Sequence, residues 1–122
     1  MTRHRWLMAV LVLVILSVGN LAWAQDQRQY VVVYVEFKPA QIQHGERVLQ
    51  ELAAVARKSP GFVNFTVLDE IARANRFALF ELWTSPQAFE DFTNSPKTQV
   101  LLQVLQPLLA APLDQRPGAL IR

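Results

Sequence analysis

The sequence predicts an α+β domain of the ferredoxin-like type, with helices on one face of a sheet. Three observations lead to this prediction. Residues 30–37, 62–68 and 76–83 are rich in β-branched and aromatic side chains, as strands are. Residues 41–58 instead repeat their apolar side chains at helical spacing. The resulting order, strand, helix, strand, strand, helix, is that of a split βαβ unit in which the third strand lies between the first two.

Local signals mark where each predicted element begins and ends. Residues 30–37 read YVVVYVEF, and Pro39 ends this strand. The helix over 41–58 stops at the sequence Ser-Pro-Gly, residues 59–61. The polar residues 69–75 predict a turn, so the second and third strands form a hairpin.

Two later helices begin with the same device. Ser85 and Ser95 each precede a proline, which is the pattern of an N-cap followed by proline in the first helical position. The second of these helices has a predicted apolar face of Val100, Leu101, Val104 and Leu105. Residues 119–121 are predicted to form a short last strand.

Alternation along the strands predicts two sheet faces of different character. The face expected to pack on the helices is wholly apolar: Val31, Val33, Val35, Val63, Phe65, Val67, Ala78, Phe80 and Leu82. The other face is expected to carry Tyr34, Glu36, Asn64, Thr66, Glu81 and Trp83. Because this second face also holds several large apolar side chains, we expect another copy of the sheet to cover it. The sequence therefore predicts a homodimer formed through the sheet face.

The first 24 residues have the composition of a secretory signal peptide. Residues 3–5 are basic, residues 7–16 are apolar, and residues 22–24 read Ala-Trp-Ala, so cleavage is expected after Ala24. The apolar run is shorter than the about 20 residues needed to cross a bilayer. An uncleaved N-terminal anchor is the alternative. We expect a periplasmic or secreted domain of residues 25–122, without stable membrane association after cleavage.

Composition excludes several classes of function. The chain has 12 Lys and Arg against 10 Asp and Glu, and the two signs balance once Arg3 and Arg5 leave with the signal segment. A neutral domain has no electrostatic affinity for nucleic acid. There is no cysteine, and the only histidine after the signal segment is His44, which is expected to be solvated. Zinc and copper sites depend on these residue types, so no metal and no cofactor are expected.

Two segments together resemble the antibiotic biosynthesis monooxygenase family. They are EFKPAQIQHGERVLQELAAVARKSPGFVNFTVL and NRFALFELWTSPQAFEDFTNSPKTQ, within residues 31–105. The residues that carry the resemblance are Lys38-Pro39, Ser59-Pro60-Gly61-Phe62, and Asn75-Arg76-Phe77 leading to Glu81-x-Trp83. The resemblance implies a dimeric α+β barrel. It also implies oxygenation of phenols or quinols without metal or flavin, although relatives degrade haem or isomerise small signalling molecules.

The chain departs from the family at several positions. Phe92 and Lys97 stand where members commonly have histidines, and Phe65 stands where many have a tyrosine. Haem degradation is therefore a minor alternative, because no histidine follows His44 to bind the iron.

Oxygenation without a cofactor requires the substrate to act as the reductant, after a protein group has taken its proton. Glu81 and Glu36 are the candidate catalytic bases, because a carboxylate in apolar surroundings has a raised pKa. The candidate substrate-binding residues are Tyr34, Asn64, Thr66, Trp83 and Phe92. The structural alternatives are an ion pair of Glu81 with Arg76 or with an arginine across the dimer, and a core position for Trp83.

Two functions follow from this pattern. The first is an exported monooxygenase that acts on a small quinol or phenol with molecular oxygen. The second is a non-catalytic dimer of the same fold that binds an apolar small molecule. A polar-lined cavity beside Glu81 favours the first, and a cavity filled by Phe65, Trp83 and Phe92 favours the second.

Overall fold

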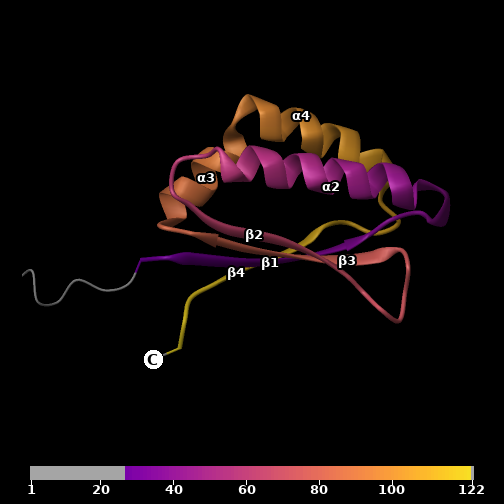
Figure 1. Ribbon diagram of the computed structural model, residues 1–122, viewed down its shortest axis with the longest axis horizontal. Coiled ribbons are helices and arrows are strands. Elements are labelled where there is room, and N and C mark those ends of the chain that lie inside the picture. The colour runs from indigo at the N-terminus through magenta and orange to yellow at the C-terminus, as the bar shows by residue number, and fades with distance from the viewer. Residues whose placement is uncertain (1–26, 122) are drawn as a thin grey trace, which may run out of the picture.

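The computed structural model describes residues 27–121, and the predicted signal segment lies outside them. A layer of helices covers one face of a single sheet (Figure 1). The elements follow in the order β1 (Gln29–Glu36), η1 (Pro39–Gln41), α2 (Ile42–Arg57), β2 (Phe62–Asp69), β3 (Arg76–Trp83), α3 (Pro86–Asn94), α4 (Pro96–Leu105), η2 (Gln106–Leu108) and β4 (Asp114–Gly118).

The sheet has the strand order β2-β3-β1-β4, and every pair of neighbours is antiparallel. β3 lies between β1 and β2, so the predicted ferredoxin-like fold and the β2–β3 hairpin are confirmed. The prediction of a last strand at residues 119–121 was wrong, because β4 pairs with β1 from Asp114 to Gly118. An edge strand can include Pro117, since one side of its backbone needs no hydrogen-bond partner.

The predicted helix starts are confirmed at atomic detail. The Ser85 hydroxyl accepts a hydrogen bond from the Ala88 backbone N–H at 3.1 Å, and the Ser95 hydroxyl accepts one from the Thr98 N–H at 3.4 Å. Each serine therefore satisfies one backbone donor that the first helical turn would leave free. Pro86 and Pro96 follow directly, where a missing N–H costs nothing.

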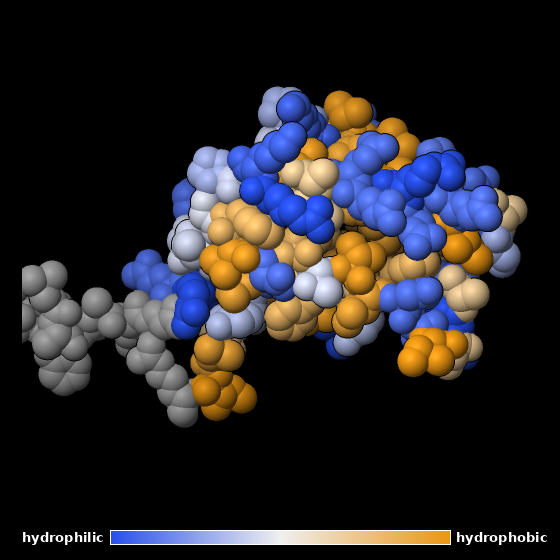
Figure 2. Space-filling model, in the orientation of Figure 1, coloured by the Kyte–Doolittle hydropathy of each residue, from blue (hydrophilic) through white to orange (hydrophobic). Residues whose placement is uncertain are grey.

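Two glycines allow the helical layer to lie close to the sheet. Gly61 links α2 to β2 with a φ of 78°, and a side chain there would overlap Ala88. A side chain at Gly45, in α2, would overlap the ring of Phe37, which is fully buried. On its outer side α2 exposes polar residues, and hydrophilic side chains gather over the helices in Figure 2.

The register of the strands corrects the predicted faces. Glu81 lies opposite Val31 of β1 and Phe65 of β2, so it shares their helix-covered face. The buried residues of β3 are therefore Phe77, Leu79, Glu81 and Trp83. We had expected Ala78, Phe80 and Leu82 there, and this prediction was wrong. Alternation tells which residues of a strand share a face, but only the register between strands tells which face that is.

The face without helices, called the open face below, carries Tyr34, Glu36, Asn64, Thr66, Leu68 and Phe80. Three of its large side chains are well exposed: Tyr34 at 48 %, Phe80 at 41 % and Leu68 at 53 %. Val63, predicted to pack on the helices, is also exposed, because the β2–β3 register shifts between Phe62 and Asn64. No helix among residues 27–121 is long and apolar enough to cross a membrane.

Candidate active site

Glu81 is a carboxylate buried between the sheet and the helices. Only 4 % of the residue is exposed. Its Oε1 atom accepts a hydrogen bond from the indole Nε1–H of Trp83 at 3.1 Å, and within residues 27–121 it has no other hydrogen bond or ion pair. Burial raises the pKa of Glu81 from its ordinary 4.5 to about 7, and the hydrogen bond from Trp83 partly opposes this rise. Glu81 is thus able to accept and release a proton near neutral pH.

Three aromatic rings form a wall next to this carboxyl group. Trp83 is fully buried, as expected of a core aromatic, and its ring stacks on Phe92 with centroids 4.8 Å apart. Phe92 in turn meets Phe65 edge to face at 6.3 Å. Packing against Phe92 restricts the position of the Trp83 indole, which donates the hydrogen bond to Glu81. The orientation of the carboxyl group therefore depends on this packing.

A cavity of about 100 Å³ lies beside Glu81, between the sheet and helices α3 and α4. Most of its lining is apolar: Val33, Leu52, Phe65, Leu79, Phe89, Phe92, Leu102, Leu105 and Leu113. The polar lining residues are Glu81, Thr93, Thr98 and Gln115. A dry apolar cavity of about 150 Å³ holds benzene. A single aromatic ring therefore fits here only when half-buried side chains of the lining, such as Phe89 and Leu102, move outward.

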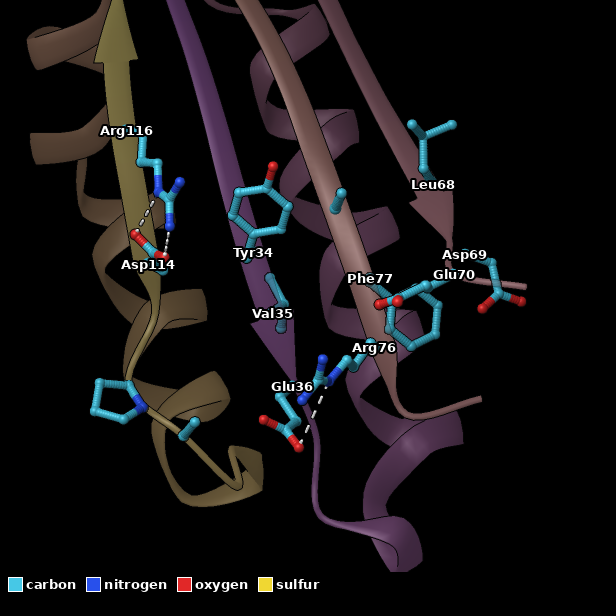
Figure 3. A pocket seen from close by; sticks show the side chains of 13 residues that line it. Tyr34, Val35, Glu36, Leu68, Asp69, Glu70, Arg76, Phe77, Asp114 and Arg116 are labelled. Atoms are coloured by element: carbon cyan, nitrogen blue, oxygen red, sulfur yellow. Dashed lines mark hydrogen bonds and ion pairs between the residues drawn. The ribbon is translucent and has the colours of Figure 1, made fainter. Parts of the chain in front are cut away.

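The structure places the other predicted site residues on the open face, away from Glu81. Tyr34 and Glu36 line a shallow depression of about 780 Å³ on that face (Figure 3). Glu36 forms an ion pair with Arg76 at 3.8 Å. Arg76 therefore does not pair with Glu81 as the structural alternative proposed.

Further contacts occupy the open-face side chains. The Arg116 guanidinium lies 5.1 Å from the centroid of the Tyr34 ring and pairs with Asp114 at 2.7 Å. This pairing lowers the pKa of Asp114 below its ordinary value. The Asn64 amide donates to the Thr66 hydroxyl at 2.9 Å. The predicted set of seven residues is thus divided: Glu81, Trp83 and Phe92 lie on the helix side, and the other four lie on the open face.

Of the two hollows, the smaller one is the better candidate site. The open-face depression is larger and more open, and four of its charged side chains form the pairs Glu36–Arg76 and Asp114–Arg116. The cavity beside Glu81 combines apolar walls with a carboxyl group of shifted pKa, a combination typical of catalytic sites. Within residues 27–121 no group of three or more His, Cys, Asp or Glu is placed to hold a metal ion. His44 is exposed on α2.

The family model described as antibiotic biosynthesis monooxygenase matches residues 28–103, which include β1 to β3, α3 and most of α4. This chain belongs to that family. The match covers Glu81, Trp83 and most of the cavity lining, whereas Leu105 and the lining residues near β4 follow it. This is the same family that the sequence resemblance indicated. Membership of it supports a monooxygenase-like function in general terms.

Solved structures similar to this antibiotic biosynthesis monooxygenase family member confirm the fold. Rv0793 from Mycobacterium tuberculosis has a TM-score of 0.74 at 17% identity, covering 79% of this chain and 97% of that one. A variant of SnoaB, a cofactor-independent oxygenase from Streptomyces nogalater, has a TM-score of 0.68 at 21% identity, covering 80% and 96%. A conserved protein from Methanosarcina mazei Go1 has a TM-score of 0.72 at 16% identity, covering 76% of this chain and 92% of that one. Comparison with curated proteins finds no match.

Most lining residues of the cavity in this family member were not among the predicted site residues, and Phe89, Thr93, Thr98 and Gln115 are four of them. Thr98 had a detectable signal, because it lies three, four and seven residues before Leu101, Leu102 and Leu105, and so belongs to one helical face. The predicted α4 face was shifted instead. It included Val100 and Val104, which are 58 % and 38 % exposed. Gln115 had no such signal, since β4 was not predicted.

Trp83→Phe is expected to raise the pKa of Glu81 above about 7. The phenyl ring keeps most of the packing against Phe92, but it cannot donate the hydrogen bond that stabilises the ionised carboxylate. The pKa is measured by NMR titration of the side-chain carboxyl carbon. A fall in the pKa would contradict the assignment of Trp83 as the stabilising donor.

Proposed function

We propose that this protein is an exported, cofactor-independent monooxygenase that acts on a small quinol or phenol. The observation that carries the proposal is Glu81, a carboxyl group with a pKa of about 7 inside an apolar cavity. A base poised near neutral pH is what removal of a phenolic proton requires. The apolar walls favour an aromatic ring and exclude water from the reactive anion.

The reaction proceeds in balanced steps for a hydroquinone as substrate. Glu81 takes a hydroxyl proton, and the resulting anion passes one electron to molecular oxygen. The two radicals combine, so that a ring carbon forms a bond to oxygen. Loss of the hydrogen on that carbon, with cleavage of the O–O bond, releases the second oxygen atom as water. The product is a hydroxyquinone, which has gained one oxygen and lost two hydrogens, and all the electrons come from the substrate.

The proposal includes a homodimer that forms through the open face. Tyr34, Leu68 and Phe80 are large, exposed and on the same face, an arrangement that favours burial against another protein surface. The charged pairs Glu36–Arg76 and Asp114–Arg116 would surround this apolar centre (Figure 3). Export is supported by the basic, apolar and small-residue pattern of residues 1–24.

The test is oxygen consumption by the purified protein with a panel of hydroquinones and phenols, in the presence of a metal chelator. We expect uptake above the rate of autoxidation for at least one single-ring compound. Glu36→Gln is the matched control, because Glu36 is the other predicted base but lies on the open face. This variant is expected to keep the full rate. No uptake with any compound would contradict the proposed activity.

A second function, non-catalytic binding of a small apolar molecule, is favoured by the two phenylalanines of the cavity. Phe65 and Phe92 narrow the space beside Glu81 and offer no polar group to a substrate. The same panel separates the two functions. A compound that raises the melting temperature without oxygen uptake identifies a binding protein, since a ligand that binds only the folded state stabilises it.

A further inference from the structure

Thr98 is a buried polar side chain that the proposed reaction does not yet use. It lies in the first turn of α4, is 2 % exposed, and lines the same cavity as Glu81. Two of its neighbours on this helix face, Leu102 and Leu105, are apolar and also line the cavity. A hydroxyl group placed among them is a specific feature of the site, because burying a polar group is unfavourable unless it is hydrogen-bonded.

The hydrogen bonds around Thr98 leave one donor unused. The Ser95 hydroxyl accepts from the Thr98 backbone N–H at 3.4 Å and donates its own hydrogen to Thr98 Oγ1 at 2.8 Å. Thr98 Oγ1 therefore acts as an acceptor in this pair. Within residues 27–121 the Thr98 hydroxyl makes no hydrogen bond other than the one to Ser95. A hydroxyl has one donor and two acceptor sites, so the Thr98 donor is left over in a residue that lines the cavity.

We propose that Thr98 donates a hydrogen bond to an oxygen atom of the ligand that occupies this cavity. The ligand class, a single ring that bears oxygen, rests on the proposed function. Ser95 acts as the positioning residue, since the same hydroxyl caps α4 and orients the Thr98 hydroxyl. The cavity then contains two polar contacts of different kinds. Glu81 receives the proton of a ligand hydroxyl, and Thr98 donates to a ligand oxygen.

This arrangement predicts selectivity for oxygenated rings over hydrocarbons of the same size. Phenol can satisfy the Thr98 donor, whereas toluene leaves it unpaired in an apolar cavity. A neutral hydrogen bond contributes about 0.5–1.5 kcal/mol. That range corresponds to roughly a two- to thirteenfold preference in the dissociation constant.

The experiment measures the dissociation constants of phenol and toluene by calorimetry under anaerobic conditions. Thr98→Val keeps the shape of the side chain but removes the hydroxyl group. It is expected to weaken phenol binding roughly two- to thirteenfold while toluene binding changes less than about twofold. Thr98→Ser retains a hydroxyl and is expected to keep the phenol preference of the original protein. If Thr98→Val does not fold, Thr98→Ala is a second hydroxyl-free variant, and the phenol-to-toluene ratio is again expected to fall.

Three results would overturn the proposal. One is a phenol-to-toluene ratio that stays unchanged in the hydroxyl-free variants because neither affinity changes. Another is a ratio that stays unchanged because both affinities fall by the same factor, which indicates a structural role for Thr98. The third is a failure of phenol to bind the original protein. Because binding is measured without oxygen, a protein that binds phenol through Thr98 but consumes no oxygen would contradict only the oxygenase activity.

Discussion

Glu81→Gln is expected to reduce the rate of oxygen consumption by a factor on the order of 10²–10⁴, the usual contribution of a general base. Glutamine has nearly the same shape, and its Oε1 atom can still accept the hydrogen bond from Trp83. It cannot accept a proton from a phenol at any accessible pH. The variant therefore keeps the cavity and its aromatic wall but loses the step that forms the reactive anion. The measurement is the initial rate in an oxygen electrode, after subtraction of autoxidation.

The matched variant Glu36→Gln removes a carboxylate of the same type from the other face of the sheet. Its rate is expected to stay unchanged, because Glu36 is paired with Arg76 and does not line the cavity beside Glu81. Equal rates for the original protein and Glu81→Gln would refute Glu81 as the base. A loss in Glu36→Gln alone would move the site to the open face.

Catalysis is expected to depend on pH through the ionisation of Glu81. Only the ionised form of Glu81 accepts a proton, and burial raises its pKa to about 7. For a given substrate, the observed rate is proportional to the fraction of enzyme in which Glu81 is ionised. The rate is therefore expected to increase as pH rises through about 7. The residual rate of Glu81→Gln should lack this step.

Stability is expected to depend on pH in the opposite direction. The pKa of Glu81 is about 7 in the folded protein against an ordinary value of 4.5, so between these values the folded state binds a proton that the unfolded chain releases. This contribution to the free energy of unfolding is fully present below pH 4.5 and is lost as pH rises through about 7. At about 1.36 kcal/mol per pKa unit, its size is about 3 kcal/mol.

Glu81→Gln has no titratable group at this position, so comparison with the original protein gives the contribution of Glu81 alone. The free energy of unfolding of the original protein, minus that of the variant, is expected to fall by about 3 kcal/mol between pH 4 and pH 8. It is measured by chemical denaturation at one fixed protein concentration, because oligomers make stability concentration-dependent. If the difference between the original protein and Glu81→Gln does not change between pH 4 and pH 8, the pKa of Glu81 is not raised in the folded protein.

The secondary structure was predictable because its signals are local. The β-branched and aromatic composition of residues 30–37 and 76–83 indicated strands with nearly the observed ends, and Ser85 and Ser95 indicated the observed helix starts. β4 was missed because Asp114–Gly118 has polar side chains, a proline and a glycine, so nothing in its sequence favours a strand. It forms because β1 offers an unpaired edge.

The candidate site was predictable only in part, since it depends on which face of the sheet each strand turns to the helices. Glu81 and Trp83 were chosen correctly as a pair, because two residues separated by one position always share a face. Their grouping with Tyr34 and Glu36 was wrong. Alternation has two possible phases, and nothing within residues 76–83 selects between them.

The amino-acid sequence by itself determined the family, the order of the elements and the presence of a Glu-x-Trp pair on the third strand, because these depend on residue type and short-range spacing. The tertiary structure alone decided that Glu81 is buried under the helices, that Glu36 pairs with Arg76 on the open face, and that Thr98 lines the cavity. These facts follow from the pairing of Val31 and Phe65 with Glu81 and from the docking of α4 on the sheet. Both are contacts between residues far apart in the chain, and local patterns do not encode them.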